Sequence, residues 1–198
     1  MKTDLSRRLF SVGEIYKILY QGLRSVSLMA KTKKSGELSE DFIERIMLAV
    51  TEVNGCEVCS YAHTRMALEA GMSIEEIQSM LAGDNTTVPD EQIEAIMFAQ
   101  YYADSRGKPS QEAWERIVSG YGLSKSYGIL GSIRVIMMGN AVGIPWSSLK
   151  NRLKGNPDKR SSLLYEFGTI FLVIFAIPIA LLHAKMAKVM KKEIANFY

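Results

Sequence analysis

The chain has 198 residues, of which 47% are hydrophobic and 23% charged, and its formal net charge is +3. This composition is typical of one globular domain with an additional segment, and so small a charge argues against nucleic acid as a partner. Lysines and arginines cluster at 31–34 and from Lys150 to Arg160. Neither cluster alternates with stacking aromatic residues, so we interpret both as solvated surface or linker.

The first ten residues, MKTDLSRRLF, lack the long apolar core of a secretory signal. The whole chain contains only two cysteines. We therefore expect a cytoplasmic protein, because paired cysteines in a reducing compartment are typically catalytic and cycle between thiol and disulfide.

Helical signals follow one another along the chain. Ser11 with Glu14 and Ser73 with Glu76 have the spacing of capping boxes, and Pro89 stands where a first helical turn would begin. Strand signals are scarce, so the sequence predicts an all-α fold. The expected helices run from 11 to about 30, 39–54, 56–71, 73–83, 90–105, 110–119 and 124–142.

The last of these helices contains Gly128, Gly131 and Gly139. Each costs ~1 kcal/mol of helix propensity relative to alanine, so we expect close backbone packing against a neighbour. We divide the chain into an N-terminal helix (1–34), a catalytic domain (35–146), and a basic linker with an apolar C-terminal helix (147–198).

The segment from Glu52 to His63, EVNGCEVCSYAH, holds both cysteines and one of the two histidines. In a helix that begins at Cys56, the positions of Cys56, Cys59 and His63 are i, i+3 and i+7 and share one face. The reactive form of cysteine is the thiolate, which a helix N-terminus and a nearby imidazole stabilise. A second thiol one turn away can close a disulfide, so the segment has the features of a redox dithiol.

The two cysteines and the histidine could instead bind zinc or be inert core residues. Structural zinc normally takes four protein ligands, whereas only two cysteines and one histidine are close here. Buried cysteines and histidines are also common as inert core residues. The clustering of all three on one helix face favours redox chemistry, with neither a metal nor a cofactor.

The segment GCEVCSYAHTRMALEAGMSIEEI resembles the signature of the carboxymuconolactone decarboxylase superfamily, in particular its alkyl hydroperoxidase D-like branch. The resemblance covers about residues 35–145. It implies an alkyl hydroperoxidase D-like helical domain, to which this chain adds an apolar C-terminal helix. It also implies a homo-oligomer that reduces a hydroperoxide and is itself reduced by a lipoyl protein, thioredoxin or a small thiol.

By the same resemblance, Cys59 attacks the peroxide, Cys56 resolves the product, and Glu44 and His63 relay protons. Glu44 lies twelve positions before the first cysteine, as the acidic residue of that branch does. One position departs from the pattern, since the characterised hydroperoxidases carry a histidine where this chain has Val58. The decarboxylase branch generally lacks the cysteine pair, which disfavours decarboxylation.

The residues alone do not rank the two cysteines. The helix dipole favours a thiolate at Cys56, whereas Cys59 and His63 form an i, i+4 pair. Glu52 is an alternative to Glu44, because it also precedes Cys56 on the same helical run.

No charged residue occurs between Glu166 and Lys185. The apolar run 167–182 would extend only ~24 Å as a helix, short of the ~30 Å hydrocarbon core, and it contains Pro178. Both flanks are basic, so the positive-inside tendency assigns no orientation. We expect the tail to be buried between subunits or to associate with a membrane through residues 163–192.

The function that we expect from the sequence is thiol-dependent reduction of hydroperoxides through a CxxC disulfide cycle. Two alternatives remain open. One is a dithiol-disulfide oxidoreductase that acts on a partner protein, and the other is a membrane-associated assembly protein whose cysteines are structural.

Overall fold

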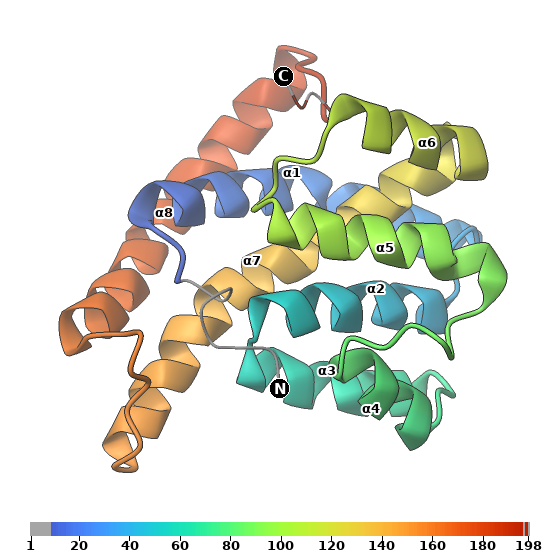
Figure 1. The fold of residues 1–198 in the computed structure, drawn as a ribbon. Coiled ribbons are helices and arrows are strands. Elements are labelled where there is room, and N and C mark those ends of the chain that lie inside the picture. Colours follow the sequence, from blue (N-terminus) through green and yellow to red (C-terminus); the bar gives the residue numbers. More distant parts are fainter. Residues whose placement is uncertain (1–8, 196, 198) are drawn as a thin grey trace.

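The computed structural model describes residues 9–195 and 197, which form eight α-helices and no strand (Figure 1). The predicted all-α class and the additional apolar C-terminal helix are therefore confirmed. Most of MKTDLSRRLF, on which the expectation about a secretory signal rests, lies outside the described residues. The helices are α1 (Val12–Ser35), α2 (Glu40–Asn54), α3 (Glu57–Glu69), α4 (Ile74–Leu81), α5 (Asp90–Asp104), α6 (Gln111–Tyr121), α7 (Leu123–Leu153) and α8 (Leu163–Val189).

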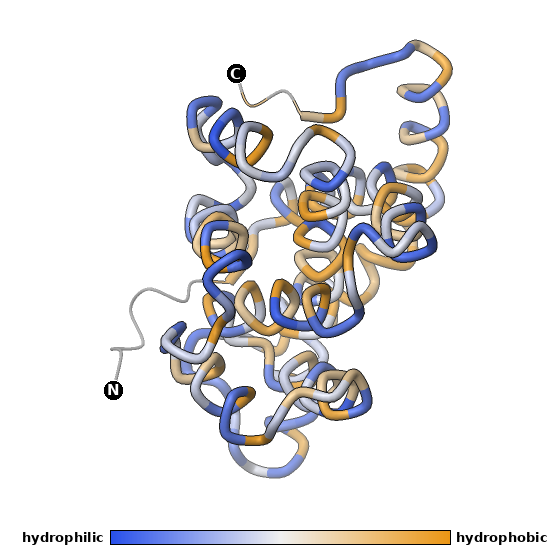
Figure 2. Tube along the Cα trace, turned by 90° about the vertical axis from the view of Figure 1, so that its right-hand side faces the viewer, coloured by the Kyte–Doolittle hydropathy of each residue, from blue (hydrophilic) through white to orange (hydrophobic). Residues whose placement is uncertain are grey.

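The central element is α7, which packs against α1, α2, α3, α5, α6 and α8. In Figure 1, α6, α5 and α2 lie one below another, with α3 and α4 beneath them. Hydrophobic and hydrophilic positions alternate around the helices (Figure 2), as expected of helices that bury one face in a common core. The cysteine helix α3 lies against both α2 and α7.

The first predicted capping box is present, and the second is only half formed. The Ser11 hydroxyl accepts from the Glu14 amide, and the Glu14 carboxylate accepts from the Ser11 amide at 2.7 Å. The Ser73 hydroxyl likewise accepts from the Glu76 amide at 3.1 Å. The Glu76 carboxylate, however, accepts from Arg45 Nε at 2.6 Å instead of reaching back to Ser73. A tertiary ion pair thus replaces the local contact, because a guanidinium binds a carboxylate more strongly than an amide does.

The first helix is longer than predicted. It continues through the lysines at 31–34 to Ser35 and ends at Gly36, which has a φ of 75°. These lysines are exposed on the last turn of α1, so they form solvated helix surface and not a linker. Positive charge is favourable there, because the carbonyl end of a helix carries a partial negative charge.

The predicted end of α7 at residue 142 is wrong. The helix continues through Pro145 to Leu153, so residues 147–153 of the expected linker are helical. Its last turn is fixed by tertiary contacts: Arg152 Nε donates to Glu166 of α8 at 2.8 Å. This hydrogen bond holds the pKa of the buried Glu166 carboxyl below its usual value. Contacts of this kind compensate for the hydrogen bond that Pro145 cannot donate.

Close packing around the glycines of α7 occurs at two of the three predicted positions. A Cβ atom on Gly131 would lie 2.8 Å from the backbone nitrogen of Met29 in α1, and one on Gly128 would lie 2.7 Å from Cβ of Thr32. Gly139 does not fit the prediction, since its nearest contact would be at an ordinary 3.7 Å. Helices α1 and α7 therefore approach one another more closely than side chains would permit.

A partly buried ion pair joins the start of α1 to the turn that follows α5. Arg106 Nε donates to Glu14 at 2.7 Å. Burial by itself would raise the pKa of Glu14, but hydrogen bonds from Arg106 and Ser11 outweigh burial and lower this pKa from 4.5 to about 2. The ionised carboxylate therefore stabilises the folded state.

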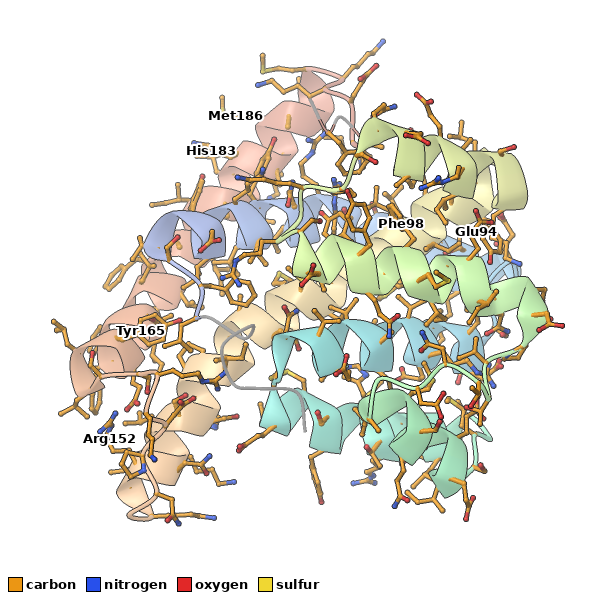
Figure 3. All side chains as sticks on the ribbon, in the orientation of Figure 1. Glu94, Phe98, Arg152, Tyr165, His183 and Met186 are labelled. Carbon is orange, nitrogen blue, oxygen red and sulfur yellow. A yellow bond between two sulfur atoms is a disulfide. The ribbon has the colours of Figure 1, made fainter. Side chains whose placement is uncertain are left out.

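The C-terminal helix α8 lies along one flank of the molecule and packs against α1 and α7. Figure 3 shows Tyr165 near its start and His183 and Met186 nearer its end. Both α7 and α8 are long and apolar enough to cross a membrane. They differ in their surroundings, because most of α7 is buried in the protein whereas most of α8 is exposed.

Candidate dithiol site

The two cysteines lie at the start of α3. Gly55, with a φ of 67°, ends α2 and turns the chain, and Cys56 follows as the extended N-cap residue of α3. Cys59 lies on the first turn, and the two cysteines are joined by a disulfide with their Cα atoms 5.3 Å apart. The i, i+3 spacing therefore produces the disulfide that the sequence led us to expect.

The N-terminus of α3 donates a hydrogen bond to the first cysteine. The backbone amide of Cys59 donates to Cys56 Sγ at 3.4 Å. After reduction, the same amide and the positive end of the helix dipole would stabilise a thiolate at Cys56. Cys56 is thus suited to serve as the leaving thiolate when the other sulfur is attacked.

His63, one turn further along α3 than Cys59, pairs with a glutamate of α2. His63, on the second turn of α3, places its Nδ1 2.7 Å from Oε2 of Glu44 on the second turn of α2. Both side chains are largely buried. A carboxylate only accepts hydrogen bonds, so Nδ1 carries the proton and Nε2 is left to take up or release one. This pairing has the form of a proton relay oriented by a carboxylate.

The alternative carboxylate, Glu52, is not part of this pair. It lies buried near the end of α2, and it is Glu44 that accepts from His63. Two turns of α2 separate the two glutamates, so only one of them can lie beside His63 on the second turn of α3.

The two cysteine residues differ slightly in exposure. Cys56 is fully buried, whereas Cys59 remains 8% exposed. Between them lies Val58, the position at which this chain departs from the predicted hydroperoxidase pattern, and its side chain is exposed at the surface. A small oxidant can therefore reach Cys59 more readily than Cys56.

Helix α7 packs over the disulfide at Gly143, a residue that the sequence did not single out. A Cβ on Gly143 would lie 2.7 Å from Cys56 Sγ and 2.9 Å from Cys59 Sγ. Glycine is therefore the residue that leaves room for the disulfide against α7. Nothing in the local sequence indicated this, because the contact joins segments more than eighty residues apart.

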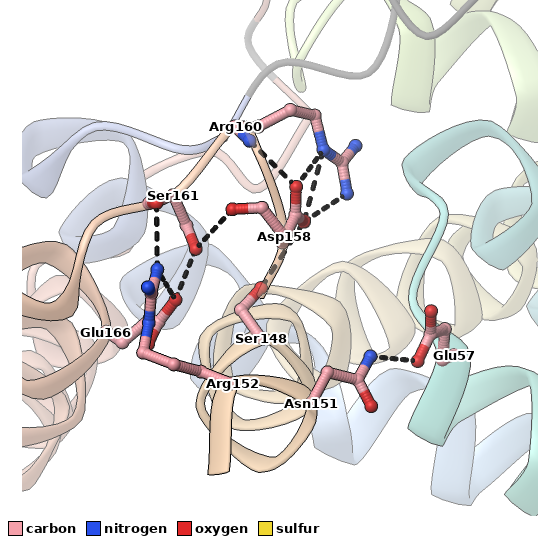
Figure 4. A network of polar contacts seen from close by, with 8 residues as sticks. All are labelled: Glu57, Ser148, Asn151, Arg152, Asp158, Arg160, Ser161 and Glu166. Carbon is pink, nitrogen blue, oxygen red and sulfur yellow. Dashed lines mark hydrogen bonds and ion pairs between the residues drawn. The ribbon is translucent and has the colours of Figure 1, made fainter. Parts of the chain in front are cut away.

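A polar cleft of about 360 Å³ adjoins the dithiol between α3, α7 and the segment that follows α7. Gly55 and Glu57, which flank Cys56, line one side. Figure 4 shows the network around the cleft, in which Asn151 donates to Glu57 at 2.9 Å and Arg160 binds Asp158. Among the described residues, no group of three or more His, Cys, Asp or Glu side chains is arranged to hold a metal ion.

The fold and the site define an all-helical dithiol protein, with a CxxC disulfide at a helix N-terminus beside a His–Glu pair. Residues 23–100, from α1 into α5, match the carboxymuconolactone decarboxylase family, so this part of the chain is a domain of that family. It contains Glu44, His63 and both cysteines, whereas Gly143 lies beyond it. No curated protein and no solved structure matches the chain.

Proposed function

We propose that the protein is a thiol-dependent peroxidase of the alkyl hydroperoxidase D-like branch. The observation that carries the proposal is the disulfide between Cys56 and Cys59, placed on the same helix as a histidine that is held by a buried glutamate. A dithiol supplies two electrons, and the His–Glu pair supplies the proton movement that reduction of a peroxide requires.

In the first step, the thiolate of Cys59 attacks the terminal oxygen of the hydroperoxide. The sulfur–oxygen bond forms as the oxygen–oxygen bond breaks, which leaves a sulfenic acid on Cys59 and an alkoxide. His63 takes the thiol proton of Cys59 beforehand and then gives it to the alkoxide. The charge of Glu44 stabilises the imidazolium between these two transfers.

In the second step, the thiolate of Cys56 attacks the sulfur of the sulfenic acid. Hydroxide leaves with a proton as water, and the disulfide forms. Two thiols and one hydroperoxide thus give one disulfide, one alcohol and one water. A lipoyl protein, thioredoxin or a small thiol then supplies two electrons to return the disulfide to dithiol.

The assignment of the attacking sulfur rests on the resemblance and on access to solvent. Cys59 is the more exposed of the two residues. The amide that donates to Cys56 Sγ suits Cys56 as the leaving thiolate when a reductant attacks Cys59. Expectations about the homo-oligomer, the domain boundaries and the cytoplasmic location remain predictions.

A dithiol-disulfide oxidoreductase is the second candidate, favoured by the amide contact to Cys56, as in thioredoxin-like motifs. Both cysteines are buried, however, so the disulfide of a partner protein would have to reach a nearly covered Cys59. A small peroxide and a small-thiol reductant do not face this obstacle, whereas a lipoyl protein or thioredoxin faces it as well.

Peroxide consumption tests the proposal. The reduced full-length protein is mixed with hydrogen peroxide or cumene hydroperoxide and with a dihydrolipoyl protein, thioredoxin or dithiothreitol in turn. We expect catalytic loss of peroxide with at least one reductant and none in Cys59→Ser. Reduction of a protein disulfide without peroxide turnover would support the oxidoreductase, and thiols inert to both would support structural cysteines.

A further inference from the structure

The side of α8 that faces away from the protein is a row of large apolar side chains. Phe171 is 60% exposed and Phe175 is 66% exposed. No residue from Phe167 to Ala184 is charged. We call this surface the α8 outer face, and its other exposed members include Leu164, Phe167, Ile174 and Leu182.

The opposite side of α8 is already occupied. Its alanines, Ala176, Ala180 and Ala184, are buried at helical spacing against the body of the protein. The Tyr165 hydroxyl donates to the backbone carbonyl of Phe10 at 3.0 Å, and His183 contacts the Tyr16 hydroxyl. These contacts fix the rotation of α8, so the outer face cannot turn into the core.

Positive charge borders the outer face at both ends. Lys185, Lys188, Lys191 and Lys192 are exposed beside its C-terminal end, and Lys154 and Lys159 are exposed in the segment that precedes α8. Within the described residues, none of these lysines takes part in an ion pair. The single acidic residue of α8, Glu166, is buried and paired with Arg152.

We propose that α8 lies in the plane of an anionic lipid surface, with its outer face immersed among the acyl chains and its flanking lysines on the head groups. An amphipathic helix with a large apolar face and basic ends has the features of interfacial membrane helices. Each exposed lysine near an anionic surface adds to the binding.

Charge and packing disfavour two alternatives: a second copy of the chain on the outer face, and a helix α8 that spans the membrane. If a second copy covered the outer face, parallel or antiparallel pairing of α8 would bring one basic end against another. The exposed Glu193 offsets only one of the four lysines at the C-terminal end. A membrane-spanning α8 would have lipid on all sides, whereas its inner face packs on α1 and α7 and carries the buried pair Glu166–Arg152.

Vesicle flotation tests this inference independently of the redox chemistry. The full-length protein is purified in detergent and mixed with vesicles of phosphatidylcholine alone or with one quarter phosphatidylglycerol. We expect flotation with the anionic vesicles, weaker flotation with the neutral ones, and partial release at high salt.

Matched variants identify the surface. Phe171→Asp with Phe175→Asp should abolish flotation, whereas Met97→Asp on α5, at a side chain that is 59% exposed, should leave it unchanged. Lys185→Ala with Lys188→Ala should weaken binding to anionic vesicles roughly 30-fold. Circular dichroism establishes that each variant is folded.

Three results would overturn the inference. The first is a protein that floats with neither kind of vesicle and forms a dimer in light scattering. If Phe171→Asp with Phe175→Asp dissociated that dimer, the outer face would be assigned to a second copy. The second is equal flotation of the double aspartate variant and Met97→Asp. The third is protection of one basic end of α8 from trypsin added outside the vesicles, which would show that the helix spans.

Discussion

Replacing Glu44 by glutamine removes one charge from the proposed proton relay and changes little else. Glutamine is nearly isosteric, and its carbonyl oxygen can still accept from Nδ1 of His63, which lies 2.7 Å from the carboxylate. What is lost is the attraction between the carboxylate and the imidazolium that forms when His63 takes the thiol proton. A charged hydrogen bond of this kind contributes about 1.5–3 kcal/mol, so we expect peroxide reduction at neutral pH to slow by roughly 10- to 150-fold.

The assay is initial-rate peroxide consumption with dithiothreitol in excess, on protein whose fold is verified by circular dichroism. Glu52→Gln is the matched control, because Glu52 is equally buried on the same helix but does not bind His63. It should retain activity. His63→Ala should slow the reaction by roughly 10- to 1000-fold, and adding Glu44→Gln to it should cost little more. Full activity in Glu44→Gln, or equal losses in both glutamine variants, would refute the relay.

Cys59→Ser should abolish turnover, and Cys56→Ser should trap a sulfenic acid on Cys59 that mass spectrometry detects; a sulfenic acid on Cys56 in Cys59→Ser would reverse the roles. Gly143→Ala should lower the free energy of unfolding of the oxidised protein by about 1–3 kcal/mol in urea titrations, because its Cβ would overlap both sulfurs, whereas Gly139→Ala should not lower it. The Glu14 carboxyl, with a pKa lowered to about 2, stabilises the fold above its unfolded pKa and ceases to do so as pH falls toward 2. Between pH 5 and pH 3 this loss should be about 2 kcal/mol in urea titrations and absent in Glu14→Gln; identical pH profiles would contradict it.

Local signals were sufficient where the structure depends on local contacts. The Ser11 cap, the turn at Gly55 and the start of α5 after Pro89 all involve residues within one helical turn, and the sequence placed them correctly. The end of α7 was misplaced, because Pro145 and the basic residues after it have the composition of a break. That helix persists through contacts between distant segments, which one sequence does not display.

The same distinction applies to the site. The spacing of the cysteines and His63 along α3 was visible in the sequence, since all three lie on one helix. Glu44 required the family pattern, because the spacing alone left Glu52 as an alternative. Gly143 gave no signal at all, since its role depends on where α7 crosses α3.

The thiol count in a single turnover tests the central claim most directly. The fully reduced protein receives one equivalent of hydroperoxide without any reductant, and free thiols, remaining peroxide and the disulfide linkage are then measured. We predict loss of two thiols per chain for each peroxide consumed, with Cys56 and Cys59 joined to one another. Two free thiols that survive while the peroxide persists would contradict the account.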